Sequence, residues 1–207
     1  MKLEHFYHVY AVAAWKDVVT EHLDALVESG LPIDVINLGV VGSPVAQAQV
    51  YDLVSKRIPA TVVAHAEQGA EEITLAALWR QVTRHRGSGA ILYAHTKGVH
   101  NATPLNIAWR RSMTKFLVTG WRDCVPLTAD HDLVGCHWLS ARNLAMYGNG
   151  PSGPCFGGNF WWATREWLAG LESPRDSGDR FDAETWIGGR PRVVDLNPGW
   201  PAMELFG

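Results

Sequence analysis

The fold is decided by the stretch Ile33-Asp-Val-Ile-Asn-Leu-Gly-Val-Val41, which is followed by Gly42-Ser-Pro44 and a helical pattern over Val45–Arg57. The apolar run is typical of a strand that is buried on both faces of a sheet. Pro44 stands in the first turn of the predicted helix, where proline is favoured. A buried strand that passes directly into a helix indicates an α/β fold with a parallel sheet.

The same alternation extends over the first hundred residues. We expect further strands over Phe6–Ala13, Ala60–His65 and Ala90–Ala94, and further helices over Trp15–Ser29 and Ile73–His85. Repetition at this spacing predicts a mostly parallel sheet with right-handed crossovers, flanked by helices.

The second half of the chain is less regular. We expect a long helix, a strand, a glycine- and proline-rich loop, a short strand, a helix and an edge strand, in that order: Asn106–Trp121, Asp132–Trp138, Gly148–Gly158, Phe160–Ala163, Arg165–Leu171 and Val193–Leu196. No internal repeat or linker is visible, so residues 1–207 are predicted to form a single domain.

Composition excludes several classes of protein. Apolar residues make up 47% and charged residues 19%, which is typical of a globular chain. A net charge of −3 gives no general attraction to nucleic acid or to an anionic membrane. A basic and aromatic segment, Trp109–Arg122, still leaves contacts with DNA phosphates open.

Cysteine usage and hydropathy bear on the compartment. The three cysteines, Cys124, Cys136 and Cys155, lack C-x-x-C spacing, which argues against a disulfide framework and a structural zinc site. No apolar stretch approaches the roughly 18 residues that a membrane span needs. We therefore expect a cytoplasmic protein without a membrane span.

Three islands of polar residues with glycine or tryptophan interrupt the predicted elements. They are Tyr93-Ala-His-Thr-Lys-Gly98, Gly157-Gly-Asn-Phe-Trp-Trp162 and Arg180-Phe-Asp-Ala-Glu-Thr-Trp-Ile187. In an open α/β sheet, ligands bind beyond the carboxyl ends of the strands. The islands therefore predict one site that is assembled from several loops.

The first island directly follows the fourth predicted strand. Lys97 would neutralise a diphosphate as a point charge, His95 would donate to a phosphate or a leaving oxygen, and Gly98 would let backbone approach the ligand. The alternative is a turn with an exposed Lys97 and a capping Thr96. A phosphate-binding loop of the G-x-x-x-x-G-K-[ST] kind and a G-x-G-x-x-G fingerprint are both missing from the sequence, which disfavours kinases, ATPases and dehydrogenases.

The second island joins glycines to an amide and two indoles. Gly158 would let the chain lie flat against a sugar, Asn159 would hydrogen-bond its hydroxyls, and an indole would supply an apolar face. The alternative is a tight turn before a buried aromatic strand. Alternation along that strand assigns one of Trp161 and Trp162 to the core and the other to the cleft, without deciding which.

The third island carries two acids beside Trp186, an indole that we also expect to contact the nucleotide sugar. Asp182 and Glu184 face the same way on an extended segment and diverge on a helix. An acid in a partly desolvated site would act as a general base on a hydroxyl, because burial raises its pKa. The alternative is a helix start with favourable acids. Of the two acids we favour Glu184. His65, which ends the third predicted strand, is expected to face the same crevice.

These islands belong to a wider pattern of motifs. It comprises Tyr93-x-His-Thr-Lys-Gly98, Trp109-Arg-Arg-x-Met113, Asp132-x-Val-Gly-x-x-Trp138, Gly158-Asn-Phe-Trp-Trp-Ala163 and Ala183-Glu-x-Trp-Ile-Gly188. The pattern resembles a family of small glycosyltransferase-like proteins of bacteria and phages, which have the A-type, Rossmann-like glycosyltransferase fold. The likeness covers residues 90–188 well and the amino-terminal half only by architecture.

The resemblance implies roles for particular residues. A nucleotide-diphosphate sugar would lie at the carboxyl edge of the first strands, with the nucleotide bordered by Ala11–Ala14, including Val12 and Ala13, and by His65–Gly69. The diphosphate would lie at His95–Gly98, and the sugar and acceptor at Gly158–Trp161. Glu184 would be the acid near the reacting centre. Residues 1–98 would then form a nucleotide-binding half and residues 99–207 an acceptor and catalytic half.

Two departures from the family pattern matter. Most such enzymes carry Asp-x-Asp after the fourth strand to hold a divalent metal, and here that place reads His95-Thr-Lys97. Because a cation replaces the carboxylates, we expect no cofactor to be required and a divalent metal to be unlikely. In addition, Phe156-Gly157-Gly158 stands where the family usually has Phe-Ser-Gly.

The function expected from the sequence is a hexosyltransferase-like glycosyltransferase. It would move a sugar from a nucleotide-diphosphate donor, such as a UDP-sugar, to a hydroxyl of a glycan or a small molecule. A hydroxylated base in phage DNA is an alternative acceptor. Two different classes of protein also fit the sequence: a non-catalytic sugar-nucleotide binding module, and a structural α/β protein whose islands are only turns and caps.

Overall fold

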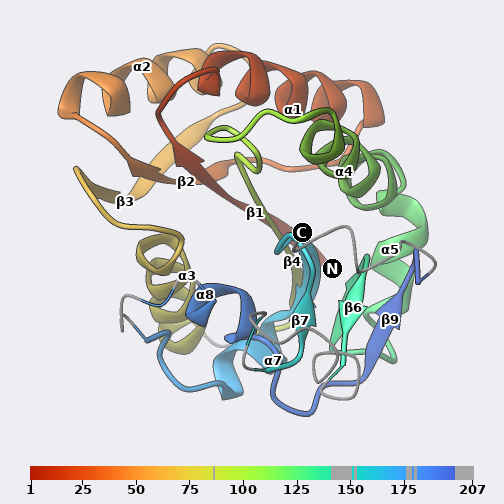
Figure 1. The fold of residues 1–207 in the computed structure, drawn as a ribbon. Helices are drawn as coiled ribbons and strands as arrows, with labels where there is room; N and C mark the ends of the chain where they lie inside the picture. Colours follow the sequence, from red (N-terminus) through yellow and green to blue (C-terminus); the bar gives the residue numbers. More distant parts are fainter. Residues whose placement is uncertain (86, 141–150, 152, 176–178, 180, 199–207) are drawn as a thin grey trace.

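A computed structural model describes residues 1–85, 87–140, 151, 153–175, 179 and 181–198 of the chain (Figure 1). Its main sheet has seven strands in the order β3-β2-β1-β4-β8-β5-β9. Their bounds are β1 Lys2–Tyr10, β2 Ile36–Val41, β3 Ala60–Ala66, β4 Gly89–His95, β5 Leu133–Gly135, β8 Trp161–Thr164 and β9 Val193–Asp195. Strands β1 to β4 are parallel, β5 is parallel to β9, and β8 runs antiparallel between β4 and β5.

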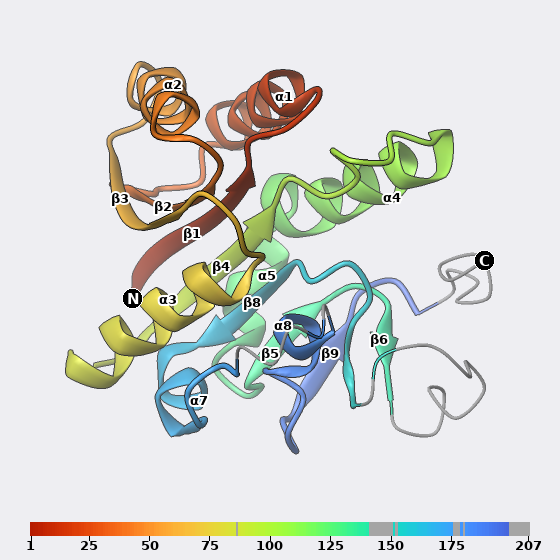
Figure 2. The same ribbon diagram turned by 60° about the vertical axis from the view of Figure 1, so that its left-hand side comes forward.

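Helices cover both faces of this sheet. Their bounds are α1 Trp15–Ser29, α2 Pro44–Ser55, α3 Glu72–Arg84, α4 Pro104–Thr114, the π-helical turn η1 Lys115–Thr119, α5 Trp121–Leu127, α7 Arg165–Gly170 and α8 Asp182–Thr185. Figure 2 shows α1 and α2 together on one side of β1, β2 and β3, and α3 on the other side. The predicted class, a single α/β domain with a mostly parallel sheet flanked by helices, is confirmed.

The hydrophobic core is divided between the two faces. One cluster packs α1, α2 and α4 against Tyr7 and Leu92, and the other packs α3 and α7 against Phe6 and Tyr93. Successive strand residues point to opposite faces, so neighbours in sequence enter different clusters. A strand in the middle of this sheet therefore has no solvent-facing side.

Local sequence explains where the helices begin and end. Ser43 caps α2 by accepting from the backbone N–H of Ala46, and Pro44 occupies the first turn. Thr103 caps α4 in the same way, and Pro104 follows it. Gly30 ends α1 in a left-handed conformation with φ of 62°.

Several predicted elements differ from the structure. The strand expected over residues 132–138 is divided between β5, in the main sheet, and β6 (Trp138–Leu139), in a separate two-stranded sheet. The helix expected over residues 106–121 is divided into α4, η1 and α5, because the backbone N–H of Gly120 bonds Lys115 O in a wide π turn. The strand expected over residues 6–13 is instead β1, which ends at Tyr10. The chain turns there, with Val12 N bonded to Tyr10 O, and Ala13 has φ of 49°.

The segment predicted as an irregular glycine- and proline-rich loop, residues 148–158, contains a short strand, so that prediction is wrong over Cys155–Phe156. β6 (Trp138–Leu139) pairs antiparallel with β7 (Cys155–Phe156). The rest of that predicted loop includes residues 148–150 and 152, which lie outside the described residues. Within the described ranges, no helix combines the length and the apolar character that crossing a membrane requires.

Candidate functional site

Polar side chains meet at the carboxyl ends of β1 and β4. His8 on β1 pairs in register with His95 on β4, so both histidines lie side by side on the face that α3 covers. His8 Nδ1 lies 2.7 Å from the hydroxyl of Thr74 on α3. Gly39 lets Thr74 approach this closely, since a Cβ on Gly39 would lie 1.7 Å from Thr74 Oγ1.

A carboxyl group that sequence reasoning missed stands at the centre of this cluster. Glu71 directly precedes α3, and its Oε2 accepts from Tyr93 Oη at 2.8 Å and from Asn159 Nδ2 at 2.7 Å. Its Oε1 lies 3.5 Å from His95 Nδ1. One side chain thus joins the start of α3, the end of β4 and the turn before β8. The available signal was its place two residues after His65–Gly69, the segment that the resemblance assigned to the nucleotide.

The electrostatics of the cluster keep its histidines neutral near pH 7. Burial, helped by the charge of Lys97, lowers the pKa of His95 to about 3. Burial likewise lowers the pKa of His8 to about 4. Burial raises the pKa of Glu71, against the pull of His8, Tyr93, Asn159 and Lys97 toward the ionised form. The cluster is not closed, since Glu71 and His95 each keep 15% of the side chain exposed.

His95 lies in the site, but both of its ring nitrogens face protein groups. Nε2 lies 2.8 Å from the carbonyl oxygen of Gly158. Because a carbonyl only accepts, Nε2 carries the proton and Nδ1 presents a lone pair toward Glu71. Donation by His95 to a leaving oxygen, as predicted, requires the bond to Gly158 to break first.

The Gly158–Asn159 turn builds the site without facing a ligand, which corrects two predicted contacts. Gly158 has φ of 89°, and a Cβ there would lie 2.9 Å from Met113 Sδ and 3.1 Å from Lys97 Cε. Gly158 therefore lets the chain pack on Lys97 and Met113. Asn159 is fully buried, and its Oδ1 accepts from Trp161 Nε1 at 2.8 Å while its Nδ2 donates to Glu71. Its amide is used inside the protein.

Both tryptophans of β8 belong to the core, so the prediction that one lines the cleft is wrong. Trp161 and Trp162 are each 0% exposed. Trp162 donates to Leu117 O on one face of the sheet, and Trp161 stacks on Tyr93 on the other, with ring centroids 4.9 Å apart. The reason is the position of β8 between β4 and β5, where both faces are covered.

Lys97 occupies the strand end as expected. Its Nζ lies 3.7 Å from the ring centroid of Trp109, and its backbone oxygen accepts from Arg110 Nη1 at 3.0 Å. Gly98 follows with φ of 78°, which favours glycine. Thr96 is buried, and its hydroxyl accepts from Tyr10 N at 2.9 Å, so it joins the ends of β1 and β4 rather than facing a ligand.

The residues predicted to border a nucleotide lie at the same edge of the sheet. Val12 and the exposed Ala13 follow β1. His65 is exposed near the end of β3, and its Nε2 lies 2.9 Å from Gly42 O. In the sheet order β3-β2-β1-β4, His65 stands on the edge strand, away from the cluster around Glu71. Their contact with a nucleotide remains a prediction.

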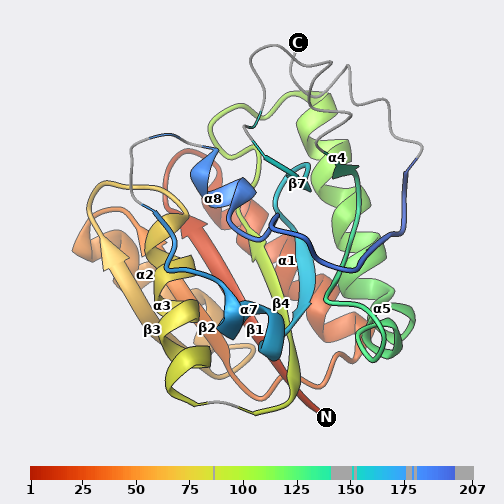
Figure 3. The same cartoon turned by 90° about the horizontal axis from the view of Figure 1, so that it is seen from below.

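The two acids of the third island lie on a helix. Asp182 and Glu184 belong to the single turn α8, so their side chains diverge, as the alternative interpretation required. Figure 3 shows α8 at the end of the sheet to which the arrowheads of the parallel strands point. The backbone oxygen of Ala183 accepts from Asn159 Nδ2 at 3.4 Å, which ties α8 to the cluster. The indole N–H of Trp186, which was expected to face the ligand, donates to the backbone oxygen of Glu172.

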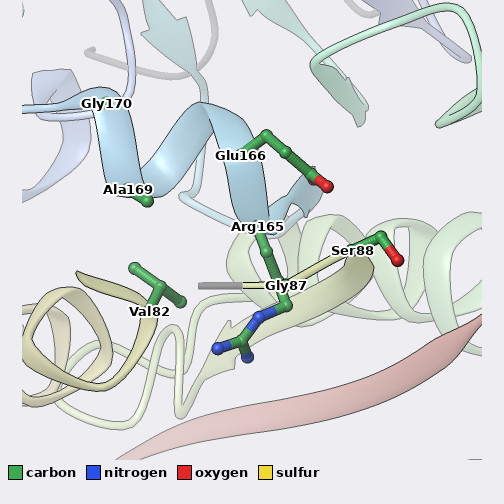
Figure 4. Close-up of a pocket in the computed structure, with 7 residues that line it drawn as sticks. All are labelled: Val82, Gly87, Ser88, Arg165, Glu166, Ala169 and Gly170. Atoms are coloured by element: carbon green, nitrogen blue, oxygen red, sulfur yellow. The ribbon is translucent and has the colours of Figure 1, made fainter. Parts of the chain in front are cut away.

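A pocket of about 380 Å³ lies elsewhere in the molecule, between α3 and α7 (Figure 4). It is lined by Val82, Gly87, Ser88, Arg165, Glu166, Ala169 and Gly170. Arg165 is already paired with Glu4 and donates to His85 O. Because the pocket adjoins the amino end of β4, it is separate from the cluster at His95, and we do not assign it to the candidate site.

Fold and site together define an α/β domain with a polar, partly buried acid and histidine cluster at the carboxyl edge of its parallel strands. The chain belongs to the family described as Domain of unknown function (DUF8361), whose model matches residues 6–185. No curated protein matches the sequence.

Solved structures that are similar to the chain include two kinds of enzyme. One is glucosyl-3-phosphoglycerate synthase from Mycobacterium tuberculosis in complex with Mn²⁺, UDP-glucose and phosphoglyceric acid, at 18% identity over 98% of this chain and 74% of that one, with a TM-score of 0.45. Another is 4-diphosphocytidyl-2C-methyl-D-erythritol synthase from Anaerococcus prevotii, at 10% identity over 98% and 92%, with a TM-score of 0.43.

These structures correct one prediction. We expected a divalent metal to be unlikely, but the glucosyl-3-phosphoglycerate synthase was crystallised with Mn²⁺ and UDP-glucose, and in a further match with Mg²⁺ and UDP. That match has 16% identity over 98% of this chain and 74% of that one, with a TM-score of 0.45. The prediction of metal independence is withdrawn.

The described residues themselves offer no ready metal cage. No three of their His, Cys, Asp and Glu side chains lie together in a way that could hold a metal ion. Glu71 and His95 supply two such groups at the carboxyl edge.

Proposed function

We propose that the chain is a hexosyltransferase-like glycosyltransferase with an A-type fold, which moves a sugar from a nucleotide-diphosphate donor such as a UDP-sugar to an acceptor hydroxyl. One observation carries this proposal: Glu71, His95 and Lys97 meet at the carboxyl edge of β1 and β4. This edge is where open α/β sheets bind their ligands. A cation suits a diphosphate, and a buried carboxyl suits a hydroxyl.

On the donor side, the main charge is Lys97. Its backbone is held by Arg110, and the neighbouring Thr96 joins the ends of β1 and β4, so the strand end is fixed before a ligand binds. The nucleotide would border Val12, Ala13 and His65, in a nucleotide-binding half formed by residues 1–98. Catalysis would come from positioning and from charge stabilisation of the departing diphosphate.

On the acceptor side, the proposed half is residues 99–207. Glu184, or Asp182, is the acid proposed near the reacting centre, because α8 reaches the cluster through Ala183 O. The placement of α8 at the carboxyl end of the sheet supports this assignment.

A glycan or small-molecule acceptor is favoured over DNA. The basic and aromatic segment that suggested DNA is used within the fold, since Arg110 and Arg111 both pair with Glu21 and Arg122 donates to Ser29 O. Trp109 is buried. Groups that are engaged in this way have little left to offer DNA phosphates.

A turnover assay tests the proposal. Wild-type protein is incubated with a panel of sugar nucleotides in Mn²⁺, in Mg²⁺ and in EDTA, and release of nucleoside diphosphate is measured. Release from one donor, lost in Glu184→Gln with the fold intact, supports the proposal. Thermal stabilisation by a nucleotide without turnover supports a non-catalytic binding module instead. If no nucleotide stabilises the protein or is consumed, the proposal is wrong.

A further inference from the structure

We propose that Glu71 is a further catalytic residue of this site, and that its Oε1, rather than a carboxylate oxygen of Glu184, accepts the proton of the acceptor hydroxyl. The chemistry rests on the proposed function, whereas the choice of atom rests on geometry. Three observations carry it: the occupied Oε2, the tautomer of His95, and the exposure of the pair.

The first observation is that one carboxyl oxygen is occupied by hydrogen-bond donors. Oε2 accepts from Tyr93 at 2.8 Å and from Asn159 at 2.7 Å, and both donor residues are fully buried. These bonds fix the plane of the carboxyl group. They leave Oε1, which faces His95 Nδ1 at 3.5 Å, as the reactive oxygen.

The second observation is that Oε1 faces an acceptor. Because Gly158 O fixes the proton of His95 on Nε2, Nδ1 presents a lone pair. An ionised Glu71 and a neutral His95 therefore turn two acceptors toward each other with no proton between them. A hydroxyl group that donates its proton would satisfy these two acceptors. The side chains of Glu71 and His95 are each 15% exposed, so a hydroxyl can approach them.

In the proposed step, the acceptor O–H bond breaks and its proton passes to Glu71 Oε1, while the acceptor oxygen forms a bond to the anomeric carbon of the sugar. The bond from that carbon to the diphosphate oxygen breaks, and its electron pair leaves with the diphosphate, beside Lys97. The new O–H of Glu71 can then donate to His95 Nδ1, whose lone pair is already aimed at it.

The surroundings of Glu71 suit a base that works near neutral pH. The titratable and polar groups that face Glu71 come from three strands or strand ends: His8 on β1, Tyr93, His95 and Lys97 on and after β4, and Asn159 before β8. Three further acids belong to the neighbouring helices, Glu72 to α3 and Asp182 and Glu184 to α8. Burial raises the pKa of Glu71, and the donors and Lys97 oppose that rise. A base tuned upward in this way takes a proton more readily than an ordinary glutamate.

The competing explanation is that Glu71 only ties three elements together. Glu71→Gln separates the two roles. The glutamine oxygen can accept from Tyr93 and Asn159, and its NH₂ can donate to His95 Nδ1, so every structural bond is kept. Only the ability to take a proton is lost. Glu72→Gln is the matched control, since Glu72 stands one residue away and accepts from Ala70 N, which a glutamine oxygen also does.

The activity arm measures kcat, KM for the donor and the pH profile. We expect wild type to lose kcat as the pH falls and Glu71 becomes protonated. Glu71→Gln should lower kcat by about 100-fold or more with an unchanged donor affinity, and should abolish that pH dependence. Glu72→Gln should behave like wild type. A kcat for Glu71→Gln within about threefold of wild type overturns the proposal.

If wild type consumes no donor, the proposed function fails, and a stability arm still tests whether Glu71 holds a proton more tightly than an ordinary glutamate, as the proposed base must. A carboxyl with a raised pKa stabilises the fold at low pH and loses that contribution as pH rises through its folded pKa. Glu71→Gln should therefore melt about 2 °C or more above wild type at pH 8, with the difference shrinking toward pH 4. A lower melting temperature of Glu71→Gln at pH 8 would show that the ionised carboxylate stabilises the fold. Glu71 would then hold a proton less tightly than an ordinary glutamate, and the proposal would fall.

Discussion

Asn159 Nδ2 donates to Glu71 Oε2 at 2.7 Å, although 88 positions separate the two residues in sequence. The same amide accepts from Trp161 Nε1 and reaches Ala183 O. Asn159 therefore determines where the carboxyl group of Glu71 stands. The amide is a positioning group, and its replacement should act on the fold and on the titration of Glu71 together.

Asn159→Asp should strongly destabilise the protein at neutral pH. The substitution keeps the shape and tolerates the φ of 51°, but it removes the donor and places a second carboxylate against Glu71 in a buried site. We expect a loss of about 3–5 kcal/mol in the free energy of unfolding at pH 8. Because the new buried carboxyl has a raised pKa, the loss should be smaller at pH 5.

Urea unfolding at both pH values measures this effect. Asn101→Asp is the control, since Asn101 is exposed shortly before α4, where a negative charge near the helix start is favoured. Equal losses for Asn159→Asp at the two pH values would contradict the coupling to Glu71.

Gly158→Ala should distort the turn that carries Asn159. The residue has φ of 89°, and its new Cβ would lie 2.9 Å from Met113 Sδ. Backbone strain and overpacking together should cost about 1–3 kcal/mol. Gly170→Ala is the control, because a Cβ at Gly170 meets nothing within 4 Å and should be neutral or slightly stabilising. Thermal unfolding of the two variants compares them; similar melting temperatures would refute the crowding argument.

Lys97→Ala should weaken the binding of a nucleoside diphosphate by about 10-fold or more, because a charge-assisted contact to phosphate is lost. Isothermal titration with UDP measures the affinity. Lys115→Ala removes an exposed lysine from η1 and should leave the affinity unchanged. If Lys97→Ala bound UDP as tightly as wild type, the assignment of the diphosphate site to the end of β4 would be wrong.

Buried histidines should make the protein sensitive to acid. Burial lowers the pKa of His5 to about 4 and that of His22 well below its usual value, and His5 Nε2 lies 2.9 Å from His22 Nε2. The unfolded chain takes up these protons near an ordinary histidine pKa of about 6.5, where the folded protein does not. The free energy of unfolding should therefore fall as the pH drops below that value toward about 4.

His22→Gln tests the acid sensitivity. It should flatten this pH dependence by up to one proton, or about 1.4 kcal/mol per pH unit, in urea titrations. His100→Gln, at an exposed position, should leave the slope as in wild type. A slope that His22→Gln does not change would mean that other groups cause the acid sensitivity.

The helices and strands of the amino-terminal half could be predicted because the residues within and next to each one determine where it begins and ends. Pro44 and Gly30 mark helix ends, and the apolar runs mark strands that stand close to β2, β3 and β4 of the structure. Periodicity also placed His95 and Lys97 at a strand end. What it could not supply was the order of strands in the second half, and the burial of both Trp161 and Trp162 depends on that order.

The cluster around Glu71 could not be predicted from the sequence for a related reason. Glu71 lies in a polar loop with no motif around it, and nothing local shows that it will meet Tyr93 and Asn159. Asn159 looked available for a ligand because its partners are distant in sequence. Residues that act through partners across the sheet are visible only once the sheet is assembled.

One reversed strand explains how the site is put together. A parallel strand delivers its last residues to the functional edge, whereas β8, running the other way, delivers the residues that come just before it. The segment that precedes β8 therefore lies next to the carboxyl ends of the parallel strands. Two segments that are far apart in the sequence contact each other at this one edge of the sheet. Substitutions at this edge should therefore occur in pairs, one in the segment just before β8 and one in the segment that follows β3.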